Sequence, residues 1–231
     1  MQRLLFANIW EHVVKEYLID YNILPNHLGY QFDFKHHQDN LEITCSGFNN
    51  QMLSYISEVM QKFINLKDEP NLEFYFDEAR ESLLWSLRTY AIDDEIDIMS
   101  EFNALIFTNR FQRKILYEQL QKYDVEIFHR GLQETLKTGH SIFYIYGNYP
   151  AQPAIHLVNK LKEMLKLKPT NVLEHPPVGV LDLVPGENLS LIQTIEDKTC
   201  EASASLFYFQ IGAMEEDSLD FAMLRTVVKY M

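Results

Sequence analysis

Apolar and polar positions alternate most regularly between residues 28 and 64. Every second residue is apolar in two runs, residues 30–34 and 41–46, which predicts two strands with one apolar face each. Residues 36–40 suit the hairpin loop between them, and residues 47–50 supply a turn and an Asn able to cap a helix. A helix follows whose apolar stripe is spaced to cover the hairpin: Met52, Ile56, Val59, Met60 and Phe63.

Helical spacing of apolar residues continues on both sides of this region. It predicts helices over residues 3–18, 76–90, 93–106, 111–123, 125–136 and 151–167. Asp124 is placed to cap the fifth of these helices, and Gly139 to end it. The inward-facing positions expected for residues 93–106 are Ile96, Met99, Asn103 and Ile106.

The stretch SIFYIY at residues 141–146 is apolar on both faces, which predicts a buried central strand. The helix after it is expected to pack on the same sheet through Ala154, Ile155, Val158, Leu161 and Leu165. We therefore expect an α/β (α+β) fold, in which a mainly antiparallel sheet carries helices packed on one face.

Prolines at positions 169, 176 and 177 mark the clearest boundary in the chain. We expect one unit over residues 1–167, a Pro-rich linker over 168–177 and an incomplete repeat over 178–231. In the last part, strands are predicted at residues 178–183, 189–195 and 202–211, before a final helix capped by Asp217 or Ser218. This order of strands followed by a helix is the same as that predicted for residues 28–64.

Three strings carry a family resemblance: GYQFDF from Gly29, LEITCSGFNNQ from Leu41, and VMQKF from Val59. Together they resemble the middle, or third, domain of the insulinase/pitrilysin family of zinc metallopeptidases. Residues 128–161 resemble the closing helix, strand and helix of that domain, and residues 178–231 resemble the start of the fourth. The resemblance implies an insulinase-like fold and a non-catalytic part of a peptidase. Because it also implies a strand before the first helix, we expect a fragment or truncated product.

The net charge of −13 opposes binding to nucleic-acid phosphates or to anionic membranes. The N-terminal residues contain acidic and polar breaks, so neither a signal peptide nor a membrane anchor is predicted. Cys45 and Cys200 are too few for a disulfide framework and read as small buried residues of a reducing compartment. A cytoplasmic location is the expectation.

The family's catalytic centre needs the inverted zinc motif His-x-x-Glu-His, in which two histidines hold the metal. None of the eight histidines begins that motif, so no catalytic residue and no metal ligand is assigned. The cluster of His36, His37, Asp39 and Glu42 is interpreted as a solvated turn, and the pair His12 and Glu16 as a local contact rather than half a metal site. Substrate-binding residues remain unassigned.

The resemblance implies a non-catalytic portion of an insulinase-like zinc metalloendopeptidase, which helps to enclose peptide substrates. Its partners would be the peptide and the catalytic half, on the same chain or another, where zinc is expected. The alternative is a stand-alone pseudo-peptidase or an interaction module without chemistry. A weaker third hypothesis is an independent hydrolase with an unrecognised site, since nucleophile-elbow and phosphate-loop patterns are missing.

Overall fold

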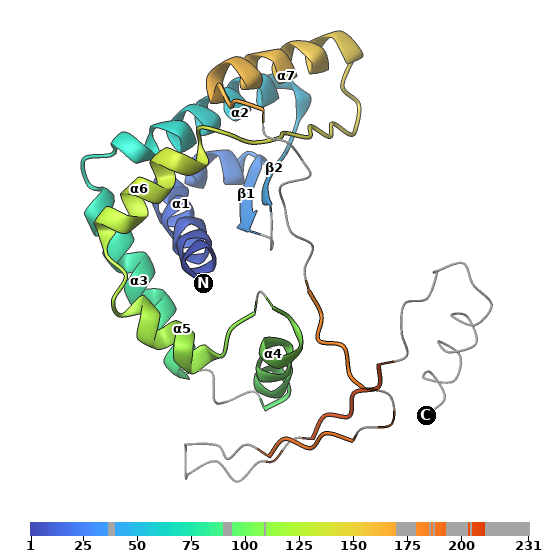
Figure 1. Ribbon diagram of the computed structural model, residues 1–231. Coiled ribbons are helices and arrows are strands. Elements are labelled where there is room, and N and C mark those ends of the chain that lie inside the picture. The colour runs from blue at the N-terminus through green and yellow to red at the C-terminus, as the bar shows by residue number, and fades with distance from the viewer. Residues whose placement is uncertain are drawn as a thin grey trace, which may run out of the picture. The chain divides into compact units, whose positions relative to one another are not determined.

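A computed structural model describes residues 1–36, 40–89, 94–108, 110–169, 179–184, 186, 188–192, 203 and 205–210, without the side chains of residues 49, 50, 89 and 94–97. The chain divides into two compact units, Met1–Val180 and Leu181–Met231. The described helices and strands all lie in the first unit (Figure 1). In order they are α1 (Gln2–His27), β1 (Gln31–His36), β2 (Leu41–Ser46), α2 (Asn49–Asn65), the 3₁₀ turn η1 (Leu66–Asp68), α3 (Leu72–Thr89), α4 (Asp94–Ile106), α5 (Arg113–Leu120), α6 (Val125–Thr135) and α7 (Ala151–Leu165).

The described part of the chain is mostly helical, with one small antiparallel sheet of two strands, β1 and β2. It is an α+β arrangement, which agrees with the predicted fold class. The hairpin brings the two predicted apolar faces to one side, since Phe32 lies opposite Cys45 and Phe34 opposite Ile43. Phe34 is fully buried, whereas its neighbour Lys35 on the other face is exposed. The period-2 pattern therefore separates a core face from a solvent face.

Two helices cover the apolar face of the hairpin. Trp10 of α1, Phe34 of β1 and Phe63 of α2 form a cluster of three rings, with centroids 5.3 Å apart for Trp10–Phe34 and Phe34–Phe63 and 5.5 Å apart for Trp10–Phe63. Such contacts add about 0.5–1.5 kcal/mol per pair to the burial term. The predicted stripe of α2 faces this core, with Val59 and Met60 buried. The N-cap of α2 is Phe48, with no side-chain cap bond, so the expected Asn cap is wrong.

Helix α1 is longer than the predicted residues 3–18, because contacts with α2 extend it. The Tyr21 hydroxyl donates to the Glu58 carboxylate at 2.8 Å, and the Tyr55 hydroxyl donates to the Asn22 side-chain oxygen at 2.9 Å. These polar partners lie on another element, so the apolar stripe of α1 alone does not predict the extension.

Helices α3, α5 and α6 complete the core on the other side of α1. Phe76, Leu120 and Phe128 are buried there. The Arg113 guanidinium donates to the Leu87 carbonyl at 2.5 Å, which satisfies the C-terminal end of α3.

Asp124 caps α6 by accepting the Ile127 amide at 2.8 Å, as predicted. In α4, Ile106 is buried, but Met99 is exposed, contrary to its expected inward position.

The predicted central strand at residues 141–146 is wrong. This stretch lies in neither a strand nor a helix, and Ile142, Tyr144 and Tyr146 are almost fully exposed. Helix α7 packs against α2 instead of on a sheet, with Leu157 and Leu161 buried and Ile155 exposed. In the described residues the sheet has two strands, so there is no third strand at residues 141–146 on which α7 could pack.

The predicted repeat at the C-terminal end does not form in the described residues. Residues 179–184, 188–192 and 205–210 contain no strand, and a single antiparallel bridge joins Val180 to Phe107. The expected linker at 168–177 and the final helix lie largely or wholly outside the described residues.

Candidate functional site

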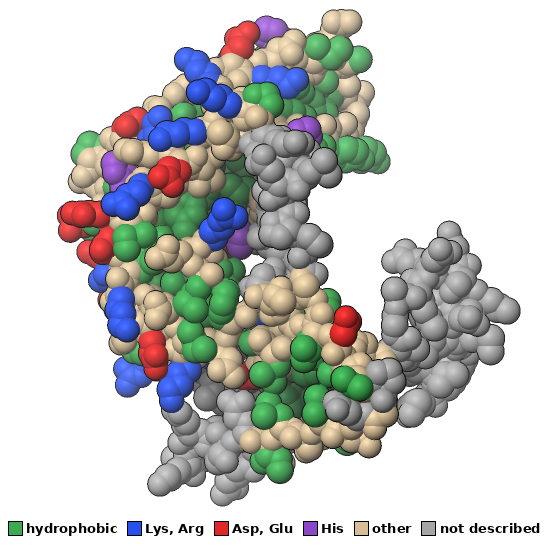
Figure 2. Space-filling model, viewed as in Figure 1, with side chains coloured by type: hydrophobic (Ala, Val, Ile, Leu, Met, Phe, Trp, Pro, Cys, Tyr) green, Lys and Arg blue, Asp and Glu red, His purple; other side chains and the backbone are tan. Residues whose placement is uncertain are grey.

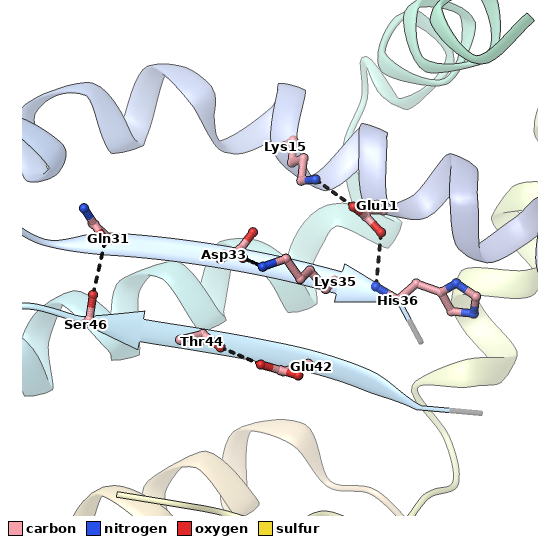
Figure 3. Close-up of polar contacts among 9 residues, drawn as sticks. All are labelled: Glu11, Lys15, Gln31, Asp33, Lys35, His36, Glu42, Thr44 and Ser46. Atoms are coloured by element: carbon pink, nitrogen blue, oxygen red, sulfur yellow. Dashed lines mark hydrogen bonds and ion pairs between the residues drawn. The ribbon is translucent and has the colours of Figure 1, made fainter. Parts of the chain in front are cut away.

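The two edges of the hairpin differ in what covers them. The β1 edge faces α1, where the Glu11 carboxylate accepts the His36 amide at 3.1 Å and pairs with the Lys15 ammonium at 2.7 Å (Figure 3). Burial opposes ionisation of Glu11, but these partners outweigh it and hold the pKa of the carboxyl below its usual value. The edge of β1 near His36 is therefore covered and satisfied.

The same contacts define the backbone direction on β2. The His36 amide bonds to Glu11 and the Phe34 amide to the Asp33 carboxylate, so on β1 the even-numbered residues point their backbone groups away from β2. In an antiparallel pair, the residues opposite them also point outward. On β2 these are Leu41, Ile43 and Cys45.

With respect to the described residues, the outer edge of β2 is therefore an open hydrogen-bonding edge. Within the described part of the chain, β2 pairs only with β1, and no hydrogen bond reaches the outward N–H and C=O groups of Leu41, Ile43 and Cys45. These three residues form the open edge of β2. The Leu41 and Ile43 side chains pack against the core, so the edge is attached to a fixed surface.

The side chain of Cys45 is a poor nucleophile at neutral pH. Burial raises the pKa of its thiol to about 12, so the thiolate form is scarce. The open edge of β2 therefore offers backbone recognition without a nucleophile.

The opposite face of the hairpin is polar and paired within itself. Lys35 forms an ion pair with Asp33, and the Thr44 hydroxyl donates to the Glu42 carboxylate at 3.1 Å (Figure 3). The hydrogen bond and charge of Lys35 lower the pKa of Asp33, and those of Asp33 raise the pKa of Lys35. Both groups stay charged near neutral pH, so this face is a solvated surface.

The candidate metal cluster at the hairpin turn is divided by the pleat. His36 lies opposite Leu41 and Glu42 opposite Lys35, so the side chains of His36 and Glu42 project from opposite faces. His37 and Asp39 lie outside the described residues. In the part of the chain that the structure describes, no three His, Cys, Asp or Glu side chains gather closely enough to hold a metal ion.

The other candidate pair, His12 and Glu16, lies on α1. His12 is half-buried, and burial is the main cause that lowers the pKa of its imidazole. Glu16 is exposed. His12 thus lies partly within the packed interior, while Glu16 lies at the surface.

A small cleft opens between α1, α3 and α5, away from the hairpin. It has a volume of about 50 Å³ and a lining of leucines, with Asn8 and Ser86 as its polar side chains. That volume accommodates about one small apolar group, far less than a ligand pocket of several hundred Å³. The open edge of β2 is the more capable feature.

Glu11, which accepts a hydrogen bond from the β1 edge, is not predicted as a functional residue from the sequence. Its signal is weak, because the i, i+4 spacing to Lys15 predicts only a pair within the helix. The bond to the His36 amide depends on how α1 lies across the hairpin.

Comparison with protein-family models and with curated proteins finds no match for the chain. Among the described residues, no helix combines the length and the apolar character that crossing a membrane requires.

Proposed function

We propose that this chain is a non-catalytic portion of an insulinase-like zinc metalloendopeptidase that helps to enclose and hold extended peptide substrates. The proposal rests on the sequence resemblance at residues 29–34, 41–51 and 59–63, and on the open edge of β2. Zinc and the catalytic residues would belong to a separate half, on the same chain or another. A cytoplasmic location belongs to the same proposal.

The open edge of β2 is the observation that carries the peptide-holding role. Leu41, Ile43 and Cys45 point their backbone groups outward from a strand whose side chains rest on the core. An extended peptide can add to such an edge as a further strand, with main-chain hydrogen bonds that do not depend on its sequence. That chemistry suits a protein that handles many peptides.

The test removes one outward donor without touching the pairing of β1 and β2. Ile43→Pro deletes an amide that points away from β1, and proline is tolerated at such edge positions. We expect the full chain to bind labelled extended peptides in fluorescence anisotropy, and Ile43→Pro to lose that binding. Ile43→Val keeps the donor and should bind as the parent does.

Thermal unfolding of each variant checks that the hairpin remains folded. Equal binding by Ile43→Pro and Ile43→Val would show that the open edge of β2 is not the site. Absence of binding by the folded parent chain would remove the peptide-holding role itself.

The alternative, a stand-alone pseudo-peptidase or interaction module, uses the same edge but needs no catalytic half. The native mass distinguishes the two. A cellular species several times larger than 27.3 kDa supports the peptidase portion, whereas a species of that mass supports the stand-alone module.

A further inference from the structure

Residues 141–146 form an exposed apolar ribbon with the geometry of a strand. Ile142, Tyr144 and Tyr146 are 86%, 85% and 88% exposed, while Phe143 between them packs against the core. The Tyr144 and Tyr146 rings lie nearly parallel, with centroids 6.5 Å apart and 4° between their planes. Alternate residues therefore point the same way, as they do in an extended strand.

The backbone of this ribbon is held at both ends but has no hydrogen-bond partner among the described residues. Before it, the Gly139 amide donates to the Lys168 carbonyl at 2.9 Å, and after it α7 begins at Ala151. In the described part of the chain, no backbone hydrogen bond involves residues 141–146. Figure 2 shows apolar side chains projecting from the stretch that leads into α7. The ribbon is thus a fixed and accessible strand edge.

Charge indicates what can approach this edge. The whole chain carries a net charge of −13, so two copies repel each other over most of their surfaces. From Thr138 to Asn159, however, the sequence contains no Asp, Glu, Lys or Arg. A second copy can therefore meet this stretch without bringing like charges together.

We propose that residues 141–146 pair with the same residues of a second copy to form a two-fold, antiparallel ribbon centred on Tyr144. In this register Tyr144 lies opposite Tyr144 of the second copy, and Ile142 lies opposite Tyr146. Aromatic–aromatic and aromatic–aliphatic cross-strand pairs of this kind stabilise an antiparallel pairing. The inference is independent of the proposed function.

The dimer is expected to be weak, because six residues from each copy bury less than the roughly 800 Å² per partner of a standard interface. Sedimentation velocity of the full chain over a range of concentrations should show a reversible monomer–dimer equilibrium. Tyr144→Lys should raise the dissociation constant at least about tenfold, since two cations would then meet at the two-fold axis.

Leu24→Lys is the matched control, because Leu24 is an exposed apolar residue of α1 and the variant gains the same charge. It should dimerise as the parent does. A parent chain that stays monomeric at every concentration, or an equal loss of dimer in both variants, would overturn the proposal.

Cross-linking tests the register. In a background with Cys45 and Cys200 replaced by Ala, Tyr144→Cys should form a disulfide dimer under mild oxidation, because directly opposite residues lie about 5 Å apart. Ile142→Cys should not, since the two copies of residue 142 would lie about 13 Å apart. Equal cross-linking of both variants would indicate random collision of surface thiols and would overturn the two-fold register. Binding of peptides to residues 141–146 without any dimer would also overturn the proposal.

Discussion

Strand β1 and residues 141–146 are two apolar extended segments of one compact unit, with opposite surroundings. Phe34 of β1 is fully buried between α1 and α2, whereas Tyr144 is 85% exposed. Residues 141–146 are the more apolar of the two, yet they remain outside the core. The difference is the partner, because β1 has β2 beside it and two helices across one face.

Hydrophobicity does not by itself bury a strand. A strand needs a neighbour for its backbone groups and an element to cover its apolar face. Strand β1 has both within the unit. Residues 141–146 have a contact to the core through Phe143 but no strand neighbour among the described residues.

The largest expected effect contrasts the two segments directly. Phe34→Ala should lower the free energy of unfolding by about 3–5 kcal/mol, because it leaves a cavity between Trp10 and Phe63. Tyr144→Ala should change it by no more than about 0.5 kcal/mol. Urea denaturation of both variants measures the difference. Similar losses would mean that Tyr144 is buried in the folded protein.

Hydrogen exchange sharpens the same comparison at the backbone. The amides of Asp33 and Thr44 point into the pairing of β1 with β2, so they should exchange at least about tenfold more slowly than those of residues 142–146. The samples should be dilute enough to keep the chain monomeric. Slow exchange of the backbone amides of residues 142–146 in the monomer would contradict this expectation, because it would mean that these amides have hydrogen-bond partners.

Substitution of Glu11 tests how the β1 edge is held. Glu11→Ala leaves the His36 amide without its acceptor and should cost about 1 kcal/mol. Glu11→Gln keeps an acceptor oxygen but loses the charge that pairs with Lys15, so it should cost less. Denaturation curves for the two variants separate the hydrogen bond from the ion pair. A larger loss in Glu11→Gln would contradict this assignment.

The smallest expected effect is a pH dependence from His12, the neighbour of Glu11 on α1. Burial lowers the pKa of His12 in the folded state, so below about pH 6.5 the unfolded chain takes up the proton first. Stability from this group is present above that pH and is lost as the pH falls. His12→Gln should reduce the loss between pH 7.5 and 5.5 by less than about 1 kcal/mol.

The exposed His156 of α7 supplies the control for this measurement. His156→Gln should leave the pH dependence of the free energy of unfolding as it is in the parent. A change as large as that in His12→Gln would assign the effect to general charge rather than to burial.

The local elements that have a single apolar face can be predicted from the sequence. The alternation through Phe32 and Phe34, the stripe of α2 and the Asp124 cap of α6 were all predicted correctly. Each depends on periodicity or on capping chemistry within a few residues, so local sequence is sufficient.

Which apolar segment joins the sheet and which edge stays open depends on the packing of distant parts of the chain. The sequence predicted a buried strand at residues 141–146. A run that is apolar on both faces has the pattern of a central strand, whether or not the fold provides a neighbouring strand. The position of Glu11 against the His36 amide, and the outward direction of Ile43, follow from how α1 crosses the hairpin and how β2 pairs with β1. These are long-range contacts, which periodicity does not encode.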